Sequence, residues 1–234
     1  LAVELTPPKA GYYIVRASAQ DARGNAVVSE SGFYAEGSDY VAWERSEDDT
    51  IKLVSDKKSY KPGDTATILI KSPYEKTRAL VTLERDHILE RRVVELTGTA
   101  PTIKVPLTSR HLPNVYVSVI LLQGRKAKQE FSPDGRDLSK PSFKLGYINL
   151  AVAPEEKRLT VKIKTDKEKY QPGEEVVADF QVTDASGAPV ESELTVAVPD
   201  QGVLALTGYT LPDWFSSFYR ARALGVTTCE TRMD

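Results

Sequence analysis

The feature that most constrains the fold of this chain is an internal repeat. Residues 56–64, DKKSYKPGD, align without a gap with residues 166–174, DKEKYQPGE. The two tyrosines of the motif, Tyr60 and Tyr170, are separated by 170 − 60 = 110 residues, and one β-sandwich domain usually has about 100 residues. Each copy lies between segments in which apolar and polar residues alternate, as in a half-buried strand. The repeat therefore predicts tandem β-sandwiches.

Each copy contains a Pro-Gly pair, Pro62-Gly63 in the first and Pro172-Gly173 in the second. Proline presets a φ of about −65° in a β-turn, and glycine accepts the positive φ that a type II turn requires next. We therefore expect the chain to reverse direction at both pairs. Two interpretations of the preceding tyrosine stay open: a ring packed under the turn with its hydroxyl bonded to backbone, or a half-buried aromatic at a strand end.

Further short strands are expected after the first copy, separated by turn-rich segments, at residues 79–83, 92–96, 102–106 and 115–122. None of them has a helical period, and about seven strands without crossover helices predict an antiparallel sandwich. We therefore predict an all-β fold. One short helix is expected near residues 212–222, because Asp213 can cap a helix whose Phe215, Phe218 and Tyr219 share one face.

The 110-residue period also divides the chain into domains. Residues 1–45 are interpreted as the end of one sandwich, because a turn at 21–25 joins two alternating segments. Residues 46–155 contain one complete sandwich, and residues 156–226 contain the beginning of a third. Half a sandwich exposes apolar surface and unpaired strand edges. We therefore expect other fragments or domains of the same parent protein to complete the first and third sandwiches.

The composition excludes several classes of function. The chain has 31 basic and 33 acidic residues, a formal net charge of −2, so nucleic acid is not an expected partner. Its one cysteine, Cys229, cannot form an internal disulfide, and its two histidines, His87 and His111, leave little for a zinc site or a Ser-His-Asp triad. Both histidines are interpreted as surface residues. The sequence predicts no enzyme, no catalytic residue, no metal and no small-molecule cofactor.

Residues 194–226 have no counterpart in the first copy. They combine a strand that ends at Asp200, a Leu-Thr-Gly-Tyr segment at 206–209 and the aromatic helix segment at 214–219. This run, together with the Tyr-x-Pro-Gly repeats and a Tyr-Val-Ala-Trp segment at 40–43, resembles the bacterial branch of the alpha-2-macroglobulin family. The resemblance covers essentially the whole chain. It implies tandem macroglobulin-like domains, which are fibronectin-III-like antiparallel β-sandwiches, leading into a bait region.

The resemblance also implies a role for the polar segment at 227–234, which would be the start of the bait region. The residues that a protease would then cut are Thr227, Thr228, Cys229, Glu230, Thr231, Arg232 and Met233. An unstructured segment is cleaved readily because it can enter an active-site cleft in extended form. An ordinary flexible terminus explains the same composition. Family members that trap covalently carry a thioester in a Cys-Gly-Glu-Gln or Cys-Leu-Glu-Gln tetrad, and Cys229-Glu230-Thr231-Arg232 does not match, so this chain contains no thioester.

The implied function is that of a scaffold fragment of a broad-spectrum protease inhibitor, which traps proteases after they cut the bait region. Target proteases would be its partners, and the parent would be exported to the periplasm or cell envelope, with lipid anchoring as one option. A structural or adhesion array of fibronectin-like modules on an exported protein is one alternative. An accessory sandwich of a carbohydrate-active enzyme is another, but it needs a carboxylate pair or an aromatic platform, for which Trp43 and Trp214 are the two tryptophans.

Overall fold

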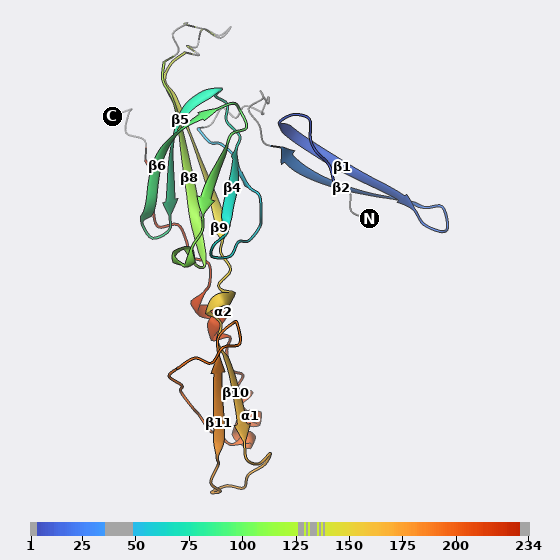
Figure 1. The fold of residues 1–234 in the computed structure, drawn as a ribbon, viewed down its shortest axis with the longest axis vertical. Helices are drawn as coiled ribbons and strands as arrows, with labels where there is room; N and C mark the ends of the chain where they lie inside the picture. The colour runs from blue at the N-terminus through green and yellow to red at the C-terminus, as the bar shows by residue number, and fades with distance from the viewer. Residues whose placement is uncertain are drawn as a thin grey trace. The chain divides into compact units, whose positions relative to one another are not determined.

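The computed structural model describes residues 4–35, 49–125 and 139–229, together with residues 129, 131, 135 and 137. The named strands within these residues pair in an antiparallel manner, which confirms the predicted all-β class. The chain divides into two compact units, Leu1–Val152 with Arg222–Asp234 and Ala153–Ala221. Figure 1 labels their elements.

The first unit contains a sandwich of two sheets (Figure 1), with strand orders β3-β4-β7 and β6-β5-β8-β9. Its elements are β3 (Leu53–Ser55), β4 (Thr65–Ile70), β5 (Lys76–Glu84), β6 (Ile88–Thr97), β7 (Thr102–Pro106), the 3₁₀ helix η1 (Ser109–His111), β8 (Asn114–Gln123) and β9 (Ser142–Ala151). The strands predicted at 79–83, 92–96, 102–106 and 115–122 lie within β5, β6, β7 and β8.

The core of this sandwich follows from the alternation of side chains along its strands. In β8, Val115, Val117, Val119 and Leu121 are fully buried, because every second residue of a strand faces the same side of the sheet. They form one cluster with buried residues of the opposite sheet, such as Ile68. Burying one such side chain stabilises the fold by about 1.5–3 kcal/mol, so this cluster stabilises the sandwich.

The first copy of the repeat forms the turn between β3 and β4. Tyr60 is 2% exposed; its hydroxyl donates a hydrogen bond to Asp56 Oδ1 at 2.7 Å and accepts one from the Lys57 N–H at 3.2 Å. Burial, and then the hydrogen bond to Asp56, raise the pKa of Tyr60. Gly63 has a φ of 95°, in the positive range that only glycine adopts readily. Of the two interpretations of Tyr60, the ring packed under the turn is therefore confirmed.

Residues 4–35 contain the hairpin of β1 (Gly11–Gln20) and β2 (Ala26–Ala35), as the sequence predicted. Its turn is held by Asp21, whose Oδ1 accepts the N–H groups of Arg23 and Asn25 at 2.8 and 2.9 Å. The side-chain hydrogen bond from Asn25, and then the backbone ones, lower the pKa of Asp21. The Tyr-Val-Ala-Trp segment at 40–43 lies outside the described residues.

The second unit places the hairpin of β10 (Thr160–Thr165) and β11 (Ala178–Thr183) around the second copy of the repeat. It also contains the 3₁₀ helix η2 (Glu155–Lys157) and the helices α1 (Gln201–Thr207) and α2 (Trp214–Phe218). Helix α2 lies where the sequence predicted a helix. Residues 191–200 belong to no strand, so the expected strand ending at Asp200 is not formed.

Helix α1 was not predicted, although the sequence carries both of its end signals. The Asp200 carboxylate accepts the N–H groups of Gly202 and Val203, and Gly208 ends the helix with a φ of 61°. An aspartate before a helix and a left-handed glycine after it are the usual caps. Helix α2 is capped in the same way by Asp213, which accepts the Ser216 N–H at 3.2 Å.

Candidate functional site

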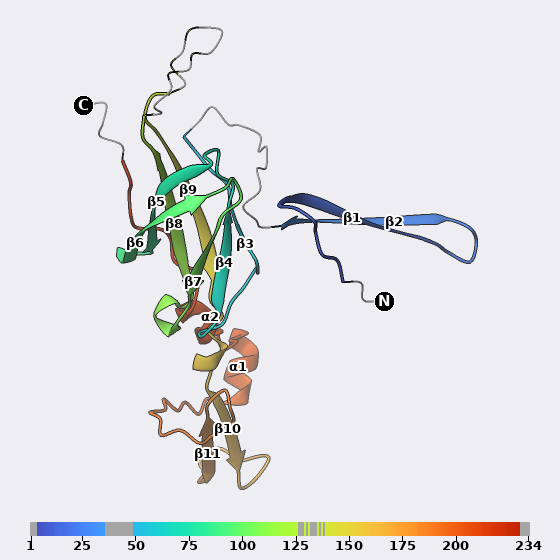
Figure 2. The ribbon, with the colours of Figure 1, turned by 45° about the horizontal axis from the view of Figure 1, so that its top comes forward.

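The structure describes the first part of the predicted bait segment and places it against the sandwich. Thr227, Thr228 and Cys229 are exposed and belong to no helix or strand; the predicted candidates Glu230, Thr231, Arg232 and Met233 lie outside the described residues. Residues 222–229, which we call the strap, run along the β6-β5-β8-β9 sheet on the face opposite the core (Figure 2). We call this the outer face. Thr227, Thr228 and Cys229, the bait candidates that the structure describes, therefore belong to a segment docked on the sandwich.

The strap begins at a clamp made by the side chain of Asn114, the first residue of β8. Asn114 is 1% exposed; its Nδ2 donates to the Arg222 carbonyl oxygen at 3.0 Å, and its Oδ1 accepts the Arg222 N–H at 2.8 Å. The same Nδ2 donates to Asn149 Oδ1 at 2.9 Å, and the Tyr116 hydroxyl donates to the Arg222 oxygen at 3.3 Å. A carboxamide offers one donor and one acceptor side by side, so it holds the strap backbone as a neighbouring strand would.

Two further hydrogen bonds hold the middle and the end of the strap. The Gly225 N–H donates to the Arg85 carbonyl oxygen at 2.5 Å, and the Tyr147 hydroxyl donates to Thr228 Oγ1 at 2.8 Å. A Cβ atom at position 225 would lie 3.2 Å from the Arg85 oxygen and from Asp86 Cα, which is tighter than ordinary contact. Glycine therefore permits this close approach of the two backbones.

Besides Asn114, three polar residues of the outer face are buried next to the strap: Thr82, Glu84 and Ser118. Glu84 pairs with Tyr116 across the sheet, and Thr82 pairs with Ser118, so all three share the face on which Tyr116 binds the strap. Thr82 Oγ1 hydrogen-bonds to Glu84 Oε1, whereas Glu84 Oε2 is buried and has no hydrogen-bond partner among the described residues. A buried polar atom without a partner costs about 1–3 kcal/mol, and more when it is charged.

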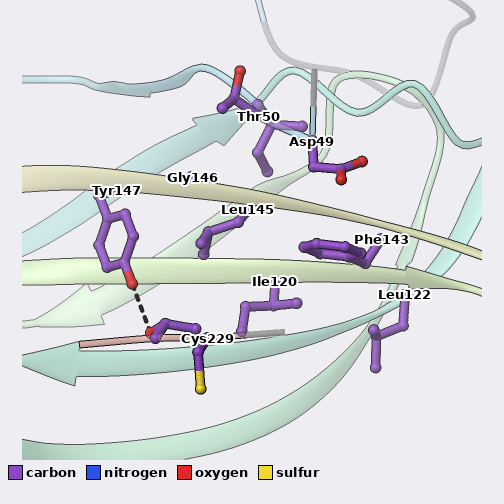
Figure 3. Close-up of a pocket in the computed structure, with 11 residues that line it drawn as sticks. Asp49, Thr50, Ile120, Leu122, Phe143, Leu145, Gly146, Tyr147 and Cys229 are labelled. Carbon is purple, nitrogen blue, oxygen red and sulfur yellow. Dashed lines mark hydrogen bonds between the residues drawn. The ribbon is translucent and has the colours of Figure 1, made fainter. Parts of the chain in front are cut away.

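The end of the strap borders a mostly apolar hollow of about 510 Å³ on the outer face (Figure 3). Its lining residues come from the chain before β3, from β8 and β9, and from the strap: Asp49, Thr50, Ile51, Ile120, Leu122, Phe143, Leu145, Gly146, Tyr147, Thr228 and Cys229.

Across the described part of the chain, no group of three or more His, Cys, Asp or Glu could hold a metal ion. No described helix is long and apolar enough to cross a membrane.

The two histidines differ in burial, and the prediction of a surface location is wrong for His111. His87 is exposed beside Asp86, at 2.9 Å from Nδ1 to Oδ2. The pKa of Asp86 is lowered to about 2 by hydrogen bonds from the backbone N–H of Asp86 itself and from the side chains of His87 and Arg85. His111 is 3% exposed, and its Nδ1 accepts the Thr108 N–H at 3.0 Å. Burial lowers the pKa of His111, and its bond to Thr108 closes the η1 turn, a structural role.

Comparisons with known proteins identify relatives of this chain. Residues 51–206 match the family model described as the alpha-2-macroglobulin bait region domain. The chain is 30% identical over 232 residues to an alpha-2-macroglobulin homolog of Nostoc sp. strain PCC 7120, a comparison that covers 99% of this chain and 12% of the relative. It is 31% identical over 218 residues to an alpha-2-macroglobulin of Ralstonia nicotianae, which covers 92% of this chain and 13% of that protein.

Among solved structures, the chain is similar to Escherichia coli alpha-2-macroglobulin in its native conformation, at 21% sequence identity and a TM-score of 0.40. The match covers 94% of this chain and 13% of the E. coli chain. The chain thus spans about an eighth of the length of these proteins. The matched family model ends at residue 206 and so includes none of the predicted bait candidates. Because that model matches more than half of the chain, and the Nostoc relative is 30% identical over nearly all of it, the chain belongs to the alpha-2-macroglobulin family.

Proposed function

We propose that this chain is a scaffold fragment of a broad-spectrum protease inhibitor, which presents a bait region to target proteases and traps them after they cut it. The observation that carries the proposal is the match to a bait region domain over residues 51–206. Cys229, which is exposed and belongs to no helix or strand, supports it, because a protease accepts extended chain and not a packed strand. In this proposal the chain itself performs no catalysis.

The proposed division of the chain is a domain end at 1–45, a complete domain at 46–155, the opening of a third at 156–226 and the start of the bait at 227–234. Exposed apolar side chains in the second unit support a domain that other parts of the parent complete. Phe180 in β11 is 39% exposed, whereas Ile70, 110 residues earlier, is 0% exposed. Surface of this kind is normally covered by further strands.

The proposed partners are target proteases and the remaining domains of the parent. The proposed location is the periplasm or cell envelope, in an exported parent that a lipid can anchor. Both follow from the family resemblance. The adhesion alternative places the same sandwiches on an exported protein, but it gives the parent no effect on proteases, so one assay separates the two functions.

The test adds increasing amounts of the full-length parent to a serine, a cysteine and a metalloprotease, and measures the hydrolysis of a large protein substrate. The proposal expects the rate to fall in proportion to added parent for all three classes, since trapping follows any cut in the bait. Heat-unfolded parent is the control, because it competes only as an additional substrate. Equal effects of native and unfolded parent would show that the protein is not an inhibitor.

A further inference from the structure

We propose that the strap, up to and including Thr228, is a releasable anchor and not bait. Residues 222–228 would be held on the sandwich, so that the cleavable stretch begins after Thr228. The identity of that stretch rests on the proposed function, but the docking is a property of this chain alone. A protease must draw consecutive residues into its cleft with their backbone groups free. Hydrogen bonds to the sandwich occupy three of these groups, the N–H and carbonyl of Arg222 and the N–H of Gly225, and the side chain of Thr228 is held as well.

Asn114 is the positioning residue of this anchor. Both backbone groups of Arg222 are bonded to its carboxamide, at 2.8 and 3.0 Å, and Asn149 fixes that carboxamide from the other side at 2.9 Å. Asn114 is almost fully buried, so water does not compete for these bonds. The peptide bond after Arg222 is thereby kept out of reach, although the residue itself is exposed.

The remaining contacts fix the strap as far as Thr228. Gly225 bonds backbone to backbone with Arg85, and Leu224 and Val226, on either side of it, are half-buried. The Tyr147 hydroxyl then holds Thr228. Thr227 lies between two fixed points, so the anchor includes two residues, Thr227 and Thr228, that the sequence placed in the bait.

Glu84 makes the anchor releasable. Its carboxylate is buried beside the strap on the outer face, and Oε2 has no hydrogen-bond partner among the described residues. A dehydrated carboxylate with one unbonded oxygen is less stable than a hydrated one. Departure of the strap returns Glu84 to water, so this residue opposes docking while Asn114 favours it.

The experiment measures the rate at which trypsin cuts the 234-residue chain after Arg222. Asn114→Ala is expected to raise this rate about tenfold, the effect of losing a pair of buried hydrogen bonds. Glu84→Met, which replaces the carboxylate with an apolar group of similar length and so removes the buried oxygen without a partner, is expected to lower it severalfold. Asn25→Ala is the matched control, since the Asn25 amide bonds to Asp21 in the β1–β2 turn, and it should leave the rate unchanged.

A second variant separates release of the strap from misfolding. Tyr147→Phe keeps the ring and removes the hydroxyl that binds Thr228, so hydrogen exchange of the Gly225 N–H, which bonds to the Arg85 oxygen, should speed up in peptides covering 224–228 and not in those covering β8. An unchanged trypsin rate in Asn114→Ala, or a wild-type rate equal to that of an unstructured peptide spanning 218–229, would overturn the proposal. Neither readout involves inhibition, so the anchor and the inhibitor function can fail separately.

Discussion

The two copies of the Tyr-x-Pro-Gly repeat form the same turn in two different settings. In each copy the tyrosine hydroxyl donates to the aspartate four residues earlier, at 2.7 Å from Tyr60 to Asp56 and at 2.5 Å from Tyr170 to Asp166. In each copy it also accepts the N–H of the lysine that follows this aspartate, at 3.2 and 2.9 Å. The motif therefore specifies the local hydrogen bonds by itself.

The two copies differ in what lies around the turn. Tyr60 is 2% exposed, whereas Tyr170 is only partly buried. The Tyr60 N–H donates to the Ala151 oxygen and the Gly63 N–H to the Leu107 oxygen; the described residues of the second unit include no such long-range bonds to the second turn. The comparison shows that a short motif determines a turn, while distant strands determine its burial and its share of the stability.

The largest expected difference concerns the tyrosine rings. Tyr60→Ala removes a buried ring and is expected to lower the free energy of unfolding of the first sandwich by about 3–5 kcal/mol. Tyr170→Ala removes a partly exposed ring and should cost about 1 kcal/mol. Urea titrations followed by hydrogen exchange of β8 and β10 peptides measure the two effects. Equal losses in both variants would refute the difference between the settings.

The glycines test the property that the two copies share. Gly63 and Gly173 have φ values of 95° and 86°, and a Cβ at either position would have nothing within 4 Å. Gly63→Ala and Gly173→Ala are therefore expected to cost the same, about 1–2 kcal/mol each, because the penalty is only the left-handed backbone. The same urea titrations provide the measurement, and a cost confined to the first copy would contradict a purely local turn.

The smallest expected effect is the pH dependence that His111 gives to the stability of the first sandwich. Burial holds the folded-state pKa of His111 below the 6.5 of the unfolded chain, so the unfolded chain takes up a proton first. The contribution of neutral His111 to the free energy of unfolding is fully present above the unfolded pKa and is lost as pH falls through the folded pKa. The loss is less than about 1 kcal/mol. Thermal melts at a series of pH values measure this loss. His111→Asn, which keeps an acceptor for the Thr108 N–H, is expected to reduce the fall in stability below pH 6.5.

Local signals made much of the fold predictable from the sequence. The repeat located both turns, alternation located β1, β2, β10 and β11 to within a few residues, and Asp213 located α2. Helix α1 was missed even though Asp200 and Gly208 cap it, because the family resemblance suggested a strand that ends at Asp200. That strand, expected up to Asp200, is absent because a strand needs a partner, and the described second unit provides none for it.

The candidate site could not be predicted in the same way, because it depends on contacts between distant residues. Asn114 and Arg222 are 108 positions apart, and neither belongs to a recognisable motif. Polar composition favoured free chain from Thr227 onward, yet a hydrogen bond from Tyr147 holds Thr228. The burial of His111 was missed for the same reason, since no neighbouring residue in the sequence indicates it.

The most direct test of the account is a map of the first cuts that several proteases of unrelated specificity make in the full-length parent, read by mass spectrometry within seconds of mixing. The account predicts that these cuts cluster C-terminal to Thr228 for every enzyme and that residues 222–228 stay intact. First cuts within 222–228, or cuts scattered over the sandwiches and the boundaries between them, would contradict it.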